Sequence, residues 1–399
     1  MFSKSGSGLV LFAAALVLSS PAGAQERPGQ RFTVSAASLP APYATPGVDN
    51  HSTVIARPKG ALPQVPRGFA IRPYVTGLTH PRFMALAPNG DVFLTEAAAD
   101  KVTRIHDGKA STFADGFSTP SGIAFHDGAL YVGDLKAVWR LAYRNGAATA
   151  GVRTRITRDD FGGTSGHVTR DIAFGPDGTL YLAIGSANNV GEDPLPRASV
   201  QIVRGDGHLR TFAAGTRNPV GIAVYPRTND LYVTVNERDG LGDELPPDYL
   251  TSLRPGDFLG WPYAYIGKHP DPEFGAKRKD LVARTKTPDV LFHAHSAPLG
   301  LVFYDGTQFP AEYKGNAFVA LHGSWDAAKP TGYKVVRIKF ANGNAENAYE
   351  NFVTGFWASG TTPPKAWGRP AGLLVDKDGS LLIADDAGKT IWRVRYTGR

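Results

Sequence analysis

The 399-residue chain contains no cysteine and only two methionines. The absence of cysteine excludes disulfides, thiolate metal sites, iron–sulfur clusters, covalently attached c-type haem and cysteine nucleophiles. Any redox chemistry therefore requires a bound organic cofactor, or a metal with oxygen and nitrogen ligands. The sequence also lacks a P-loop, a dinucleotide-binding glycine fingerprint, a His-Glu-x-x-His pair and a Gly-x-Ser-x-Gly motif.

The chain carries little excess charge of either sign. Its 43 Lys and Arg against 36 Asp and Glu leave a formal net charge of +7, so nothing in the composition requires a nucleic-acid partner. The hydrophobic fraction of 42% suffices for a large core. The 46 glycines and 30 prolines are spread along the chain, which is typical of many short strands joined by turns.

Long apolar runs are absent except near the start. Residues 1–24 resemble a secretory signal, with Lys4, an apolar run over 9–18, Pro21 and the small residues 22–24. An anchor helix is the alternative, but the run of about ten residues is shorter than the about 20 that span a bilayer. We therefore predict an exported, periplasmic protein without a membrane span, and cysteine-free composition agrees with that compartment.

Two regions follow the signal. Residues 25–65 are rich in proline and show little periodicity, which predicts an extended arm that wraps the main domain or stays partly disordered. Residues 66–397 contain a recurring pattern of a turn, an apolar strand, a glycine turn and a second apolar strand. Its copies begin near Pro81, Pro120, Arg170, Pro219, Pro298 and Pro370.

The copies are 39 to 79 residues apart, and the shorter spacings are typical of a β-propeller blade. We therefore predict an all-β fold, a six-bladed β-propeller with four-stranded antiparallel blades, in which later blades carry insertions. A solenoid is the alternative, but the helical half-repeats that it needs are absent.

Loops between blades gather at one face of a propeller, around its axis, so residues just before the repeated strands are candidate site residues. His167 precedes the third copy, and an imidazole there is suited to accept a proton near neutral pH. Arg217 and Asn218 occupy the same place in the fourth copy. The alternatives are a strand-capping histidine and an arginine in a surface ion pair.

Two further segments carry possible metal ligands. Residues 236–244 combine five charged side chains with two glycines, which suits a hard cation such as Ca²⁺, although a solvated turn explains the composition equally well. His293 and His295 lie two apart, so on a strand they would face the same side as a metal pair. No third ligand for that pair is evident.

Several motifs in order resemble one known family. They are residues 166–178, 217–221, 236–243, 259–262, 295–301, 322–325 and 368–372. Together they resemble the glucose/sorbosone dehydrogenase family of soluble quinoproteins, and most closely its sorbosone dehydrogenase-like branch, over roughly residues 66–396.

The resemblance implies a six-bladed propeller that holds pyrroloquinoline quinone (PQQ) and Ca²⁺ on its axis. By this resemblance His167 is the catalytic histidine, and Arg217 with Asn218 lies beside a quinone carbonyl. Asp239 and Gly240 fall where backbone carbonyls bind the calcium. Arg369 falls where an arginine holds a cofactor carboxylate. The implied activity is oxidation of an aldose or a sugar aldehyde, with a soluble quinone or cytochrome as electron acceptor.

The chain departs from the family pattern after His322-Gly-Ser-Trp325. Asp326 and Ala327 stand where the branch has a polar residue and an arginine, and Lys329 is a substitute cation for the cofactor carboxylates. Two other functions stay open. One is a calcium-dependent lactonase, which needs side-chain carboxylates and asparagine converging on an axial metal. The other is a propeller that only binds sugar or another protein.

Overall fold

The structure is a computed structural model and describes residues 26–398, so the predicted signal at 1–24 lies outside the described residues. Within 26–398 no helix has the length and apolar character needed to cross a membrane. The described chain is almost entirely β, with a single short α-helix, α1 (Lys279–Arg284). The all-β prediction is thus confirmed.

Antiparallel sheets of four or five strands make up the body, and residues 26–398 form six of them. The first sheet contains β4 (Pro81–Leu86), β5 (Val92–Glu96), β6 (Lys101–His106) and β7 (Lys109–Ala114). The second contains β8 (Gly122–His126), β9 (Ala129–Gly133), β10 (Val138–Ala142) and β11 (Arg153–Arg155). The third contains β12 (Ile172–Phe174), β13 (Leu180–Ile184), β14 (Ser199–Val203) and β15 (Leu209–Ala214). The fourth contains β16 (Asn218–Val224), β17 (Leu231–Asn236), β18 (Pro247–Leu253) and β21 (Val290–Ala294). The fifth contains β22 (Pro298–Phe303), β23 (Ala317–Leu321), β24 (Lys334–Ile338), β27 (Tyr349–Val353) and the short β1 (Arg31–Phe32).

The last sheet joins the two ends of the body. It contains β30 (Pro370–Val375), β31 (Leu381–Asp385), β32 (Thr390–Tyr396) and, as its outer strand, β3 (Phe69–Thr76) from the start of the body. Pairing of β3 with β32 closes the ring without a free edge between first and last repeats. Four-stranded antiparallel sheets were predicted; five of the six sheets have four strands, and the remaining one gains β1 as a fifth.

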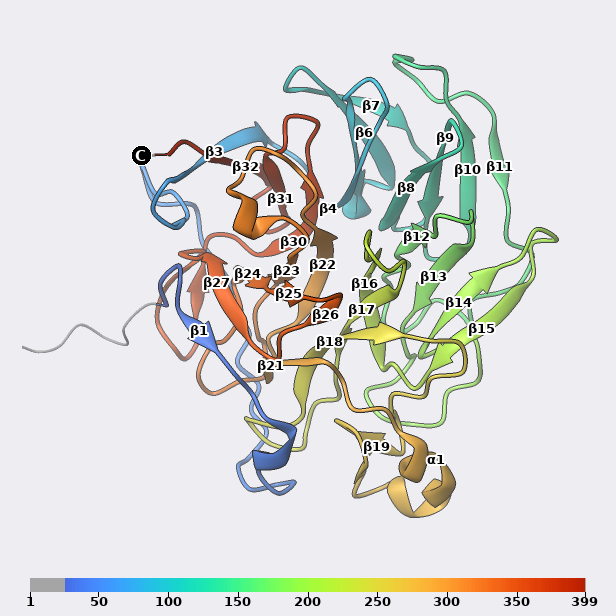
Figure 1. Cartoon of the computed structure of the whole chain (residues 1–399), viewed down its shortest axis with the longest axis vertical. Helices are drawn as coiled ribbons and strands as arrows, with labels where there is room; N and C mark the ends of the chain where they lie inside the picture. Colours follow the sequence, from blue (N-terminus) through green and yellow to red (C-terminus); the bar gives the residue numbers. More distant parts are fainter. Residues whose placement is uncertain (1–25, 399) are drawn as a thin grey trace, which may run out of the picture.

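The first strand of each sheet lies innermost. These inner strands contact one another in the cyclic order β4, β8, β12, β16, β22, β30 and back to β4, and Figure 1 shows them converging at the centre. Each sheet is covered on both faces by its neighbours, so strands such as β5 and β23 are buried at every residue. The continuous apolar stretches of the repeats follow from this arrangement.

Glycine in the inner strands permits the close approach of neighbouring sheets. A Cβ on Gly372 of β30 would lie 2.0 Å from the carbonyl oxygen of Arg82 in β4, and one on Gly221 of β16 would lie 2.2 Å from that of Leu299 in β22. The third repeat has Asp171 at this place, and its buried carboxylate accepts a hydrogen bond of 3.0 Å from the Ile222 amide of the next sheet. The glycine of the repeated Pro-x-Gly motif thus allows the inner strands of neighbouring sheets to pack closely around the axis.

We expect Gly372→Ala to lower the free energy of unfolding by about 1–3 kcal/mol, because the added methyl group overpacks the junction of last and first sheets. Chemical denaturation of the two proteins measures the difference. Gly205→Ala is the matched control, since nothing lies within 4 Å of its Cβ position. If both substitutions lower the free energy of unfolding equally, the close contact between the inner strands is not the cause of the loss.

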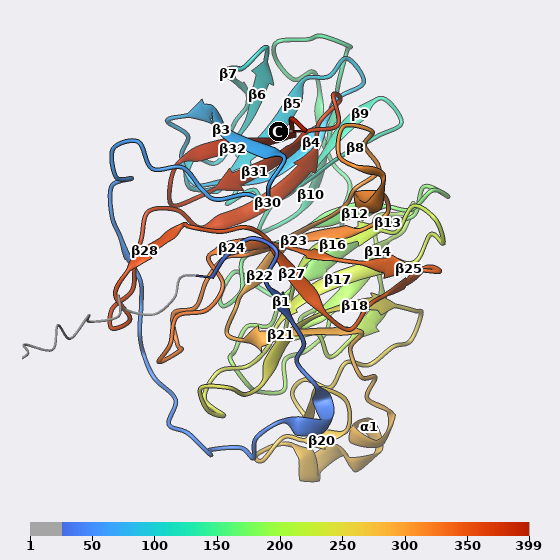
Figure 2. The same cartoon turned by 60° about the vertical axis from the view of Figure 1, so that its left-hand side comes forward.

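The proline-rich segment lies against the body along its outside (Figure 2). The Tyr43 amide donates to the Leu241 carbonyl at 2.7 Å, and the ring of His51 stacks on Trp325 with centroids 5.1 Å apart. Buried Asn50 donates through Nδ2 to the carbonyl oxygens of Ala327 and Thr361, both at 2.8 Å. The arm therefore covers the loops that follow β17 and β23.

We expect Asn50→Ala to cost about 1–3 kcal/mol, since the carbonyl group of buried Ala327 loses its donor. Limited proteolysis should then cut the arm faster than in the parent protein. Lys59→Ala, at an exposed arm position, is the control and should leave both stability and cleavage unchanged. Unchanged cleavage in Asn50→Ala would show that other contacts hold the arm.

Candidate functional site

One end of the ring collects the residues that precede the inner strands. A cavity of about 150 Å³ opens there between the third, fourth and fifth sheets. Its lining residues are His167, Arg217, Asn218, Asn236, Glu237, Asp239, Asp248, His295, Ala297, Trp325 and Asp326. The structure thus brings together His167, Arg217, Asn218 and Asp239, which the sequence analysis singled out separately.

His167 presents a neutral imidazole to this cavity. Its Nδ1 lies 3.0 Å from both the carbonyl oxygen and the Oγ of Ser186, so Nδ1 carries the proton that it donates there. Within residues 26–398 the Nε2 atom has no hydrogen-bond partner. Burial, together with the positive charge of Arg217, lowers the pKa of His167 to about 4. At neutral pH Nε2 therefore has a free lone pair.

Arg217 is buried and held by two loops. Its Nε donates to the Asn189 carbonyl oxygen at 3.0 Å, and its Nη2 contacts the Asn189 side-chain oxygen and the Asp239 carboxylate, both at 2.9 Å. Its Nη1 donates to the Glu237 carbonyl oxygen at 2.5 Å. The guanidinium is therefore fixed beside His167. Neighbouring Asn218, the first residue of β16, is buried, and its Oδ1 has no hydrogen-bond partner.

Four acidic side chains also line the cavity. Burial raises the pKa of Glu237 to about 8 and that of Asp248 to about 7. Burial opposes ionisation of Asp239 too, but His295 and Arg217 hold the pKa of that carboxyl well below its usual range. Burial raises the pKa of Asp326 to about 6. Asp239 therefore carries a negative charge toward the cavity at neutral pH.

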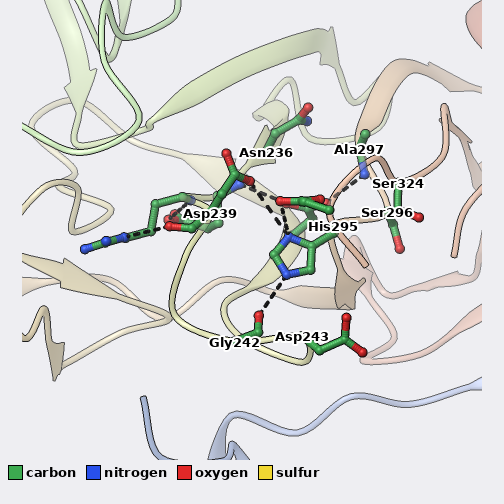
Figure 3. A network of polar contacts seen from close by, with 12 residues as sticks. Asn236, Asp239, Gly242, Asp243, His295, Ser296, Ala297 and Ser324 are labelled. Atoms are coloured by element: carbon green, nitrogen blue, oxygen red, sulfur yellow. Dashed lines mark hydrogen bonds and ion pairs between the residues drawn. The ribbon is translucent and has the colours of Figure 1, made fainter. Parts of the chain in front are cut away.

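His295 lies beside Asp239, as Figure 3 shows, and its Nδ1 also contacts Asp326. Its Nδ1 is 2.9 Å from Asp326 Oδ2 and 3.8 Å from Asp239 Oδ1, and its Nε2 is 3.0 Å from the Gly242 carbonyl oxygen. Burial disfavours the charged ring, but the two carboxylates raise the pKa of His295 to about 11.

His293 and His295, which the sequence offered only as a metal pair without a third ligand, do not form one. Strand β21 ends at Ala294, and His295 follows with a left-handed φ of 63°, so the two rings do not share a strand face. His293 contacts the Tyr349 hydroxyl through Nδ1 at 3.0 Å and lines a different cavity. Asp326, noted in the sequence only as a departure from a pattern, is instead the neighbour of His295.

Two of the residues predicted to bind the cofactor, Arg369 and Lys329, do not line this cavity. Arg369 donates to the carbonyl oxygens of Gly323 at 2.6 Å and His322 at 3.2 Å, outside the lining of this cavity. Lys329 lines a separate cavity of about 610 Å³ beneath the arm, so it is not brought to His167. Ala327 is only 3% exposed and lies under Asn50 of the arm.

The predicted calcium ligands are only partly available. The Asp239 carbonyl oxygen already accepts a hydrogen bond from Asn189 Nδ2 at 3.1 Å. Gly240 follows with a left-handed φ of 89°. Calcium on these two carbonyl groups stays a prediction, whereas the side chain of Asp239 does face the cavity.

Comparison with known proteins places this site in context. The family model described as glucose / sorbosone dehydrogenase matches residues 131–327, and a TrAA12-like model matches residues 270–397. An uncharacterised protein of Borreliella burgdorferi is 27% identical over 86% of this chain and 93% of its own length. A pyrroloquinoline quinone-dependent pyranose dehydrogenase of Coprinopsis cinerea is 27% identical over 86% of this chain, which spans 56% of that protein.

Solved structures show the same fold. A carbohydrate-active enzyme of family AA12 from Trichoderma reesei aligns with a TM-score of 0.72 and 21% identity over 87% of this chain and 100% of its own. The holo PQQ domain of the Coprinopsis cinerea pyranose dehydrogenase aligns with a TM-score of 0.70 and 21% identity, over 86% of this chain and 100% of that domain. The predicted resemblance to the glucose/sorbosone dehydrogenase family is confirmed, and its solved relatives in fold are soluble sugar dehydrogenases.

Proposed function

We propose that this protein is a PQQ-dependent oxidoreductase that oxidises an aldose or a sugar aldehyde, in a propeller whose six sheets are its six blades. The observation that carries the proposal is the neutral imidazole of His167, with a free Nε2, held beside the buried guanidinium of Arg217 in the axial cavity. The family match over residues 131–327 supports it.

The residues fit the reactive part of such a cofactor. An unprotonated nitrogen, a guanidinium and an amide face one cavity, and Asn218 Oδ1 is a buried polar atom without a partner. Arg369 and Arg82, at the inner strands β30 and β4, supply further positive charge outside the lining of this cavity, and Arg82 is paired with Asp386 at 2.7 Å. They would hold the carboxylates of PQQ where the cofactor extends beyond the cavity toward these two strands.

The chemistry of the chain's own residues follows from this arrangement. His167 Nε2 accepts the proton of a substrate hydroxyl, while Ser186 keeps the ring oriented through Nδ1. Arg217 stabilises an oxygen that gains negative charge nearby, and its own loop contacts prevent it from swinging away. When bound, PQQ supplies the acceptor for the hydride that the substrate carbon loses.

The low pKa of His167 gives a pH dependence. The base must be unprotonated, so we expect kcat/KM to stay level from neutral pH to about pH 5 and to fall below this as His167 protonates near its pKa of about 4. A histidine at its ordinary pKa of about 6.5 would lose activity below neutral pH. Rates with an artificial electron acceptor across this range distinguish the two profiles.

A calcium-dependent lactonase is a second candidate that one observation favours. Asp239, Asp326 and the amide of Asn236 converge on the cavity, as metal-dependent hydrolysis requires. Assaying lactone hydrolysis and dye-linked sugar oxidation on the same preparation, with and without PQQ, separates the candidates. Hydrolysis without added PQQ and no sugar oxidation with it would overturn the proposed function.

We also propose that the protein is exported to the periplasm with residues 1–24 removed. The basic start and short apolar run of that segment support this. Mass spectrometry of the protein from fractionated cells should give a mature chain beginning at Gln25. An uncleaved chain in the cytoplasm would contradict it.

A further inference from the structure

Three side chains from three separate loops converge at one edge of the cavity. Asp239 follows β17, His295 follows β21 and Asp326 follows β23. One potential ligand atom from each lies within 4.8 Å of those of the other two. The fold, rather than any local motif, creates this cluster, because 87 residues separate Asp239 from Asp326 in the chain (326 minus 239).

The imidazole of His295 has the orientation of a metal ligand. Its Nε2 lies 3.0 Å from the Gly242 carbonyl oxygen, to which it donates its N–H (Figure 3). Metal-binding histidines usually donate their second ring N–H to a carbonyl or carboxylate in this way, which fixes the other nitrogen as the ligand. Here that other nitrogen, Nδ1, points to the two aspartates.

The two separations from His295 fit bonds to one ion. Two atoms bonded at about 2.1 Å to the same metal are at most about 4.2 Å apart. His295 Nδ1 lies 2.9 Å from Asp326 Oδ2 and 3.8 Å from Asp239 Oδ1, and both distances satisfy this limit.

An unpartnered buried atom outside the three-residue cluster points independently to a missing ligand. Asp326 is 7% exposed, and its Oδ2 is paired with His295 inside the cluster at 2.9 Å. Glu237 lines the same cavity and is 3% exposed, and its Oε1 has no hydrogen-bond partner within residues 26–398. Leaving a buried polar atom unpaired is costly, so Glu237 Oε1 indicates that a ligand occupies the cavity beside it.

We propose that Asp239, His295 and Asp326 form a binding site for a divalent transition metal such as Zn²⁺ or Mn²⁺. One nitrogen and two carboxylate donors suit these ions, whereas Ca²⁺ takes six to eight oxygen ligands. The remaining coordination positions face the cavity that His167 and Arg217 also line. The site is distinct from calcium on backbone carbonyl groups, and it does not depend on the proposed oxidation of sugars.

A bound metal changes the charge of the cavity. In the metal-free protein a proton on His295 Nδ1 lies between the carboxylates; the metal replaces it, and binding releases that proton. The ion then offsets the negative charge of Asp239 and Asp326, so the cavity gains a centre that polarises a substrate oxygen or an anionic group.

The test uses purified full-length protein stripped of metal with a chelator and holding no cofactor. Co²⁺, an optical probe for nitrogen- and oxygen-donor sites, is titrated and followed by its visible absorbance. We expect saturation at one Co²⁺ per chain, competition by Zn²⁺, and no competition by equimolar Ca²⁺. Loss of a residue that only hydrogen-bonds a metal ligand weakens metal binding about 10–100-fold. Asp326 is proposed to bind the metal directly, so Asp326→Asn should weaken Co²⁺ binding at least about tenfold.

Asp243→Asn is the matched control. Asp243 lies on the same loop as Asp239, loses the same charge, and keeps an acceptor oxygen for the Ala328 amide. It should bind Co²⁺ as the parent does. A second ligand variant, His295→Gln, should weaken binding like Asp326→Asn, and thermal unfolding of each variant confirms that it is folded.

Three results would overturn the site: no saturable Co²⁺ binding, equal binding by Asp326→Asn and the parent, or equal weakening by Asp243→Asn. In each case the three side chains form an ion-pair network around a protonated histidine. Because no PQQ or sugar is present, these results are independent of the proposed oxidoreductase activity.

Discussion

Replacing His167 with glutamine should lower dye-linked sugar oxidation at least ~100-fold, the scale on which a positioned general base contributes. Glutamine keeps a polar group near Ser186 but has no lone pair basic enough to take the hydroxyl proton. PQQ binding should change little, because the base acts on the substrate. Steady-state turnover and a separate PQQ titration measure the two effects.

His208→Gln is the control for this experiment. His208 is an exposed histidine paired with Asp159 at 2.8 Å, away from the cavity, and its loss should leave turnover unchanged. The fall of kcat/KM at acid pH should also disappear in His167→Gln, and it should remain in His208→Gln. Turnover within a few-fold of the parent would remove His167 from the role of base.

Replacing Arg217 with lysine should lower turnover about 10²–10³-fold while weakening PQQ binding less. Lysine keeps the charge but not the fork that contacts Asn189, the Glu237 carbonyl group and Asp239 together. The lysine ammonium group should therefore adopt several positions. This should weaken the stabilisation of a developing oxyanion more than it weakens the binding of PQQ in the ground state.

The expected split between turnover and affinity distinguishes two roles. Comparable losses in turnover and in PQQ affinity would mean that Arg217 is only an anchor. Arg278→Lys is the control, since Arg278 is an exposed arginine paired with Asp280 at 2.6 Å. Thermal unfolding separates either outcome from a general loss of structure, because Arg217→Lys also loosens two loops.

The strands of this fold could be predicted from the sequence because their signals are local. The Pro-x-Gly turns and apolar runs mark the inner strands, and close approach of neighbouring backbones explains why glycine recurs there. His167 and Arg217 could be predicted for the same reason: each directly precedes an inner strand, so the repeat itself places both at one end of the axis.

The acidic side of the site could not be predicted in this way. Asp239, His295 and Asp326 lie in loops of different length, and their meeting depends on how each loop turns back toward the axis. The left-handed backbone of His295 means that its ring does not share a strand face with His293, as the spacing alone would give. Lys329 is three residues from Asp326, yet it lines another cavity, together with residues of the arm. Such placement depends on tertiary contacts rather than on spacing.

Binding of PQQ in the axial cavity and oxidation of a sugar there can both be followed on the purified cofactor-free protein. PQQ is added with Ca²⁺, and the absorbance of the quinone is recorded before and after aldose sugars or sugar aldehydes are added. We expect saturation at one PQQ per chain and bleaching of the oxidised quinone by at least one of these substrates, and we expect the bleaching to be lost in His167→Gln. If PQQ does not bind saturably, or if no sugar or sugar aldehyde reduces the bound quinone, the proposed function is wrong.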